Sequence, residues 1–346
     1  LFGWQIFDGG IMGVALGVVL GSFLQLIVSA VGLVGLGFDY NFKLYCRNRG
    51  FRKVLSLLPA RSVDQGMDYV VSLVEVNLAS RLADGTIRAY QQALTLHLMP
   101  INLIGVAISN AAFPQLTERL GEGRLDLFQK DLRSLLRIIF WMALPTSVVI
   151  FFTRGYIVHF IRNTGDQLMA GILGCLVVAI LFRTIYHMAA RAFYARQDTK
   201  TPLYISVFSI SLNIALAIIL TMNLNMGAYG LAWAQSTVAV FEVVILLLVM
   251  SKQMPRMFNR AFVTAIGKMI AASAVAGVVC YIGVSVMPFR DTDSSFFSAF
   301  PKFTIISIVS FGVYLLMSKL LRLPEVDPIL KKGRKLLFGR LDGVWR

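Results

Sequence analysis

Nine long apolar stretches are the feature of this sequence that most constrains its fold. A membrane-crossing α-helix needs about 20 predominantly apolar residues, and charged or turn-forming residues separate stretches of about that length here. Membrane β-strands would instead alternate over about 10 residues. We therefore expect an all-α polytopic membrane protein with nine transmembrane helices, near residues 9–36, 55–80, 89–113, 135–153, 168–195, 202–222, 227–250, 261–286 and 301–320.

The composition excludes the other common classes of protein. Apolar residues make up 57% of the 346 residues and charged residues only 15%, whereas soluble domains carry about 25% charge. The three cysteines and three histidines lack disulfide or metal-site spacing. No nucleophile elbow, zinc-protease motif or phosphate-binding loop is present. The sequence thus predicts neither an enzyme nor a resident metal or cofactor.

The distribution of basic residues predicts the orientation in the membrane. Of the 33 Lys and Arg residues, 24 lie in alternate loops and in the C-terminal tail, namely in 38–54, 115–137, 191–200, 251–260 and 319–346. Cytoplasmic loops are the basic ones, so these loops and the C-terminus are expected in the cytoplasm. Basic residues in the cytoplasmic loops, and their contact with anionic lipid headgroups, explain the net charge of +15. Nucleic acid is not expected as a partner, since no aromatic and basic reading surface accompanies the charge. Within the second loop, residues 117–137 predict an amphipathic helix that lies at the membrane interface and leads into the next span. A plain surface connector is the alternative.

A stripe of ionisable side chains runs along the span 55–80. Arg61, Asp64, Asp68 and Glu75 are spaced by 3, 4 and 7 residues, so at 100° per residue they share an arc of roughly 60°. Charges within a membrane usually face a wet cavity or a charged partner. The stripe therefore indicates either a water-filled transport cavity or a buried network that fixes helix packing.

Two further spans carry polar residues of the same kind. In the span 89–113, Gln91, Thr95, Asn102 and Ser109 fall within about 40° of one another, and Pro100 predicts a kink. Such residues also join membrane helices. In the span 168–195, Arg183 lies one turn from His187. A guanidinium stays charged, so Arg183 requires an anion, either a carboxylate of the acidic stripe or a substrate phosphate. Glu242 is a further charge, in the middle of the span 227–250.

Several segments resemble one family of transporters in order along nearly the whole chain. The most specific is residues 190–202 (ARAFYARQDTKTP), similar to a loop of the form FYARxDTxTP. Residues 99–108, 113–116, 16–26 and 227–232 resemble further motifs, including G-x-x-G-L-A at the last of these. The chain is thus similar to the MurJ (MviN) family, the lipid II flippases of the multidrug/oligosaccharidyl-lipid/polysaccharide exporter superfamily.

The resemblance implies an architecture of fourteen helices in two lobes followed by two extra helices. The nine spans would be the sixth to the fourteenth, with five upstream spans missing. Residues 1–54 would then be the last helix of the N-terminal lobe with a cytoplasmic loop. Residues 55–250 would be the C-terminal six-helix lobe, 251–320 the two additional helices, and 321–346 a basic cytoplasmic tail.

The resemblance also implies a function, and it shows where the candidate site residues differ from those of the family. The expected activity moves a polyprenyl-pyrophosphate-linked saccharide, lipid II by resemblance, from the inner to the outer leaflet of the bacterial cytoplasmic (inner) membrane by alternating access. H+ or Na+ is the coupling ion that acidic residues would bind. Three candidate cavity residues differ from the family. The family has an arginine at the position of Thr95 and a lysine at the position of His187. At the position of Glu242 its residue is usually uncharged. With Arg61, Asp64, Asp68, Glu75 and Arg183 these three residues form the predicted site.

Two alternatives remain open from the sequence. A cation-coupled small-molecule exporter of the same superfamily is favoured by the acidic stripe and by Thr95. A transport-inactive homologue that scaffolds cell-wall synthesis proteins is the third hypothesis, motivated by the altered cavity positions.

Overall fold

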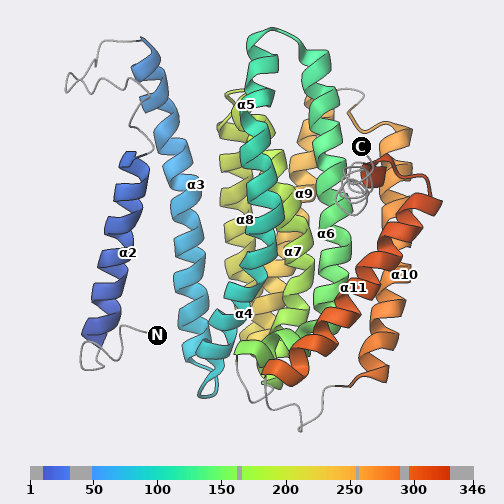
Figure 1. Ribbon diagram of the computed structural model, residues 1–346. Helices are drawn as coiled ribbons and strands as arrows, with labels where there is room; N and C mark the ends of the chain where they lie inside the picture. The colour runs from blue at the N-terminus through green and yellow to red at the C-terminus, as the bar shows by residue number, and fades with distance from the viewer. Residues whose placement is uncertain (1–10, 32–48, 162–165, 255–256, 289–295, 328–346) are drawn as a thin grey trace. The chain divides into compact units, whose positions relative to one another are not determined.

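The computed structural model describes residues 11–31, 49–161, 166–254, 257–288 and 296–327, and its elements in these ranges are helical (Figure 1). They are α2 (Ile11–Val31), α3 (Arg49–Ser80), α4 (Thr86–Pro100), the π-helix η1 (Ile101–Val106), α5 (Ala107–Gly121), α6 (Leu125–Ile161), α7 (Gln167–Ala195), α8 (Lys200–Ile218), the π-helix η2 (Ile219–Asn223), α9 (Ala228–Gln253), α10 (Arg260–Val286), α11 (Phe296–Leu320) and the short 3-10 helix η3 (Pro324–Val326). Since α4, η1 and α5 are continuous, and α8 runs into η2, the described residues form nine long helical rods. The prediction of an all-α protein with one helix per apolar stretch is confirmed.

Seven of these rods are long and apolar enough to cross a membrane, judged by length and composition within the described ranges. The other two, α2 and α3, carry shorter apolar portions, at Ala15–Val31 and Tyr69–Ser80. The chain is therefore a multi-pass membrane protein. It divides into two compact units, residues 1–56 and 57–346. The second unit contains most of the helices and the cavity that the predicted charges line.

Helix α7 is the central element of the second unit. It packs against α9, α6, α4, η1 and α5, while α8 packs on α9 and the α10–α11 pair packs on α6. Where α7 and α9 pack together, the hydroxyl of Ser236 on α9 bonds to the backbone of α7. Ser236 Oγ accepts a hydrogen bond from Ala179 N (3.2 Å) and donates one to Cys175 O (2.6 Å), the carbonyl to which Ala179 N would otherwise bond. This bridge fixes the register of the two helices.

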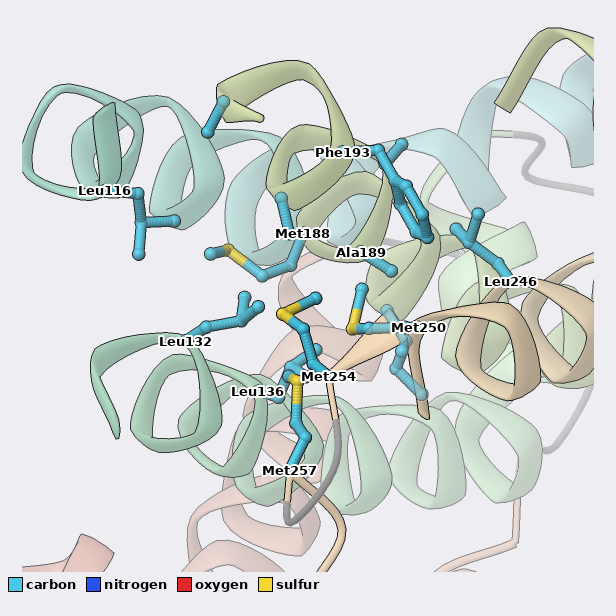
Figure 2. Packing of buried hydrophobic residues seen from close by; sticks show 14 of the residues in the cluster. Leu116, Leu132, Leu136, Met188, Ala189, Phe193, Leu246, Met250, Met254 and Met257 are labelled. Atoms are coloured by element: carbon cyan, nitrogen blue, oxygen red, sulfur yellow. The ribbon is translucent and has the colours of Figure 1, made fainter. Parts of the chain in front are cut away.

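A methionine-rich core lies where α5, α7 and α9 end and α6 begins (Figure 2). Met188, Met250, Met254 and Met257 lie among leucines and Phe193 from α5, α6, α7 and α9, all at most 1% exposed. Unbranched thioether side chains fill irregular gaps between helices. The core is contiguous across four helices and therefore holds this end of the bundle as one body.

The expectation of a single amphipathic helix over residues 117–137 is wrong, because α5 ends at Gly121 and α6 begins at Leu125 after a turn. The part from Leu125 onward is helical and leads into the next span, as expected. Its apolar face, with Phe128, Leu132 and Leu136 each 0% exposed, is part of the methionine-rich core rather than an interfacial face. On its polar side Asp131 accepts hydrogen bonds from Gln115 Nε2 and Arg119 Nε, which ties the start of α6 to the end of α5.

The loop motif at residues 190–202 has a local physical explanation. Gln197 adopts a left-handed conformation (φ 61°) directly after α7, the geometry that commonly ends a helix. Asp198, which precedes the N-cap residue Thr199, accepts hydrogen bonds from Thr201 N (3.1 Å) and Thr201 Oγ1 (2.6 Å) in the first turn of α8. Pro202 follows in the first turn of α8, where a missing N–H is tolerated. The motif thus stops one helix and starts the next.

The last turn of α11 and the segment that follows it form polar contacts with α6 and α10. Trp141 Nε1 donates to Ser318 Oγ (3.1 Å), and Lys268 Nζ donates to Leu321 O (3.0 Å). Arg137 Nε lies 2.5 Å from Glu325 Oε1, and the side chains of this ion pair are 20% and 6% exposed. The α10–α11 pair is therefore joined to the rest of the unit by hydrogen bonds as well as by apolar packing.

We expect Arg137→Ala to destabilise the protein by about 1–2 kcal/mol. Removing one partner of a fully buried ion pair costs about 3–5 kcal/mol, and the partial exposure of Arg137 reduces that figure. Thermal unfolding in lipid nanodiscs measures the loss. Arg124→Ala removes the same side chain at a 56% exposed position and is the matched control. Equal melting temperatures for the two variants would contradict a stabilising ion pair.

Candidate functional site

A cavity of about 590 Å³ lies in the second unit, between α3, the α4–η1–α5 rod, α7, α8 and α9. Four residues predicted from the sequence line it: Glu75 from α3, Arg183 and His187 from α7, and Glu242 from α9. The fold thus brings together ionisable groups that lie far apart in the sequence.

The other predicted site residues have different placements. Thr95 lies on an exposed part of α4, outside the lining of this cavity, and its hydroxyl donates to Gln91 O (2.9 Å). Arg61, Asp64 and Asp68 belong to α3, but their side chains lie outside the described residues. Their part in a site stays a prediction.

Glu75 is the centre of a buried hydrogen-bond network that connects three helices. Glu75 is only 2% exposed. Oε2 accepts a hydrogen bond from the hydroxyl of Tyr90 on α4 (2.8 Å), and Oε1 accepts one from Nε2 of Gln235 on α9 (2.8 Å). Both carboxyl oxygens therefore have donors, as a buried carboxyl group requires.

Arg183 and Glu242 form an ion pair between the two helices that pack most extensively on each other. Arg183 Nη1 lies 3.1 Å from Glu242 Oε2, with the side chains 25% and 4% exposed. The bridge at Ser236 lies nearby on α9 and fixes the register that places the two charges opposite each other. Glu242 on α9 thus supplies an anion for Arg183.

The polar face expected along residues 91–109 is interrupted by the π-helix η1, which begins directly after Pro100. A π-helix winds differently from an α-helix, so positions beyond it leave the 100° register. Asn102 lines the cavity, whereas Ser109 is 0% exposed and its hydroxyl donates to Gly105 O. A Cβ on Gly105 would lie 2.9 Å from Thr184 O on α7, so this rod approaches α7 closely, beside Arg183.

Two residues of α8 that the sequence analysis missed give the cavity a further property. Ser209 and Asn213, one turn apart, line the cavity and are 3% and 2% exposed. Neither the Ser209 hydroxyl nor the Asn213 amide has a hydrogen-bond partner among the described residues. Buried polar groups need a partner, so water or a polar ligand satisfies them. A single hydroxyl or amide in an apolar helix resembles ordinary helix-joining residues, which is why no pattern in the sequence singled them out.

Metal ligation has no evident place in the described ranges. They contain no group of three or more His, Cys, Asp or Glu side chains close enough to hold a metal ion.

Comparison with known proteins gives consistent matches to one family. The family model described as lipid II flippase MurJ matches residues 1–300. A probable lipid II flippase MurJ of Thermotoga maritima is 26% identical over 331 residues, which cover 94% of this chain and 63% of that protein. The corresponding protein of Borreliella burgdorferi is 24% identical over 251 residues, covering 70% and 49%. The chain thus spans less than two thirds of the length of these relatives.

Solved structures give the same fold. A lipid II flippase MurJ in an inward closed conformation superposes with a TM-score of 0.67 at 22% identity, over 92% of this chain and 63% of that one. An outward-facing multidrug resistance MATE family transporter of the MOP superfamily gives a TM-score of 0.55 at 13% identity, over 77% and 63%. Both likenesses concern the fold alone.

Proposed function

Because the chain belongs to the lipid II flippase MurJ family, we propose that it forms part of the pathway by which a polyprenyl-pyrophosphate-linked saccharide crosses the bacterial inner membrane. The cargo is lipid II or a close relative of it. Its headgroup passes through a polar cavity while its lipid tail stays in the membrane, and the helix bundle alternates between inward and outward access. Bond-making chemistry has no part in this proposal.

The observation that carries the proposal is the polar interior of the cavity. An arginine lines the same space of about 590 Å³ as Ser209 and Asn213, two buried polar residues of α8 whose side chains have no partner in the described part of the chain. Such groups would be costly next to lipid and are retained where a hydrated or charged ligand satisfies them. A saccharide supplies hydroxyl groups for the polar side chains, and a pyrophosphate supplies oxygens for the guanidinium.

The proposal includes an orientation and a coupling ion. The basic loops and the C-terminus face the cytoplasm, as the distribution of Lys and Arg predicts. H+ or Na+ couples the cycle to the membrane potential, worth about 2.3 kcal/mol per charge per 100 mV. Glu75 is the best-placed acceptor, because it is buried between three helices that would move relative to one another.

The test removes Arg183 from the cavity without leaving its partner Glu242 as an unpaired buried charge. Arg183→Gln combined with Glu242→Gln deletes both members of the ion pair. We expect at least about a tenfold loss of translocation, roughly 1.4 kcal/mol in the step that holds the pyrophosphate, in a lipid II accessibility assay on cells that depend on the variant. Glu118→Gln, an exposed charge outside the cavity, should leave translocation unchanged. Normal flipping by a folded double variant would remove Arg183 from the mechanism.

A second candidate, a cation-coupled exporter of small molecules, is favoured by the two carboxyl groups in the cavity, Glu75 and Glu242. The two functions predict different accumulations when the gene is depleted. A flippase predicts lipid-linked precursor in the inner leaflet, and an exporter predicts a soluble cationic compound in the cytoplasm.

A further inference from the structure

The ion pair between Arg183 and Glu242 is asymmetric in its access to the cavity. The Arg183 side chain is 25% exposed, whereas that of Glu242 is only 4% exposed. On α9, Glu242 is flanked by residues packed into the bundle, with Ala239 0% and Val243 1% exposed. A ligand in the cavity can therefore approach the guanidinium more easily than the carboxyl group, which is almost fully buried.

Arg183 is a group that can bind phosphate as well as a carboxylate. Its Nη1 lies 3.1 Å from Glu242 Oε2. A guanidinium binds phosphate through a planar fork of two parallel N–H groups. A phosphate group that reaches Arg183 can form this fork and would compete with the carboxylate for the same donors.

The same wall of α7 offers further donors to an arriving anion. His187 and Arg191 follow Arg183 at one and two helical turns, and all three line the cavity. A phosphate-bearing headgroup can therefore contact α7 at several positions along the helix. At Arg183 the carboxyl group of Glu242 on α9 competes with the phosphate for the guanidinium.

On the basis of the proposed function, we propose that Glu242 is an internal counter-ion, which occupies Arg183 when the cavity holds no cargo and which the phosphate of the cargo displaces. In the empty cavity the carboxylate balances a guanidinium charge that is partly removed from water. In the loaded cavity the displaced carboxylate disfavours long residence of the phosphate, because both anions require one cation. Glu242 is thus a positioning residue that lowers affinity and promotes release.

The test compares phosphate binding and turnover in the complete membrane protein, in lipid nanodiscs and proteoliposomes. The binding probe is farnesyl pyrophosphate, with farnesol as the probe that lacks phosphate. Glu242→Gln keeps the size of the side chain and removes its charge. We expect it to bind farnesyl pyrophosphate at least about tenfold more tightly than the unmodified protein, to bind farnesol unchanged, and to transport lipid II more slowly with a lower KM. Glu118→Gln is the matched control for loss of one negative charge.

The outcomes separate the counter-ion from the function on which it rests. If the unmodified protein does not distinguish farnesyl pyrophosphate from farnesol, the proposed cargo is wrong. If it does distinguish them but Glu242→Gln binds the pyrophosphate equally or more weakly, the cargo stands and the counter-ion is disproved, since a purely structural glutamate predicts that result. Should Glu242→Gln fail to fold, Glu242→Asp keeps the charge but shortens the side chain, and a smaller gain in affinity is expected from it. No gain with this variant would equally overturn the proposal.

Discussion

Gly230→Ala is expected to destabilise the protein by about 2 kcal/mol. A Cβ at this position would lie 2.7 Å from the carbonyl carbon of Leu220 and 2.8 Å from the amide nitrogen of Thr221. Both atoms are backbone of η2, so no change of rotamer can make room. Overpacking of a core costs about 1–3 kcal/mol, and the gain of about 1 kcal/mol from replacing Gly by Ala within a helix offsets only part of a clash between two backbones.

The control for this variant is Gly267→Ala. Gly267 lies within α10, and a Cβ there meets nothing within 4 Å. Its replacement should be neutral or stabilise the protein by up to about 1 kcal/mol, from helix propensity alone. Thermal unfolding of the two variants in nanodiscs measures the difference. Equal melting temperatures would mean that α9 and η2 are not held together as closely as the structure indicates.

The same position shows what a motif can and cannot reveal. The segment 227–232 resembles a family motif, but only the structure gives the reasons for its glycines. Gly227 has a φ of 56°, which side-chain-bearing residues rarely adopt, and Gly230 lets α9 approach η2. Hydropathy predicted all nine helices, because the bilayer imposes a length and a composition on each span. It could not predict η1, since a π segment changes the winding of a helix without changing its composition.

The error at residues 117–137 has a related cause. An amphipathic pattern shows that one face is buried, but it does not show what buries it. Here Phe128 and Leu132 are covered by other helices, and Asp131 faces the end of α5. The prediction of an interfacial helix assumed that the membrane buries the apolar face. The sequence pattern alone does not establish this.

The candidate site was partly predictable for an electrostatic reason. Charged residues within a span are costly and stand out, so Glu75, Arg183 and Glu242 were identified from the sequence. Their neutral partners were not. Tyr90 and Gln235 lie in helices with many polar or aromatic residues, and nothing in their spacing connects them to Glu75, which is 15 and 160 residues away. Which residues pair is decided by helix packing, not by periodicity.

Tyr90→Phe is expected to lower stability by about 1.5–3 kcal/mol, the usual value of a hydrogen bond to a charged group. The variant removes only the hydroxyl that donates to Glu75 Oε2, at a residue that is 0% exposed. Gln235 would remain as a donor to Oε1. The buried carboxyl group would then have lost one of the two hydrogen bonds that satisfy it, and no large cavity would form to complicate the measurement.

A double-mutant cycle separates this hydrogen bond from other effects of the missing hydroxyl. In a Glu75→Leu background the Tyr90 hydroxyl has no carboxyl group to bond, so Tyr90→Phe should cost nothing there or raise stability slightly. The two measurements in nanodiscs should therefore differ by at least about 1 kcal/mol. The same loss in both backgrounds would show that Tyr90 stabilises the bundle by packing alone. The hydrogen-bond network would then not be what joins α3 to α4 and α9. The proposed role of Glu75 as the acceptor of the coupling ion would lose its structural support.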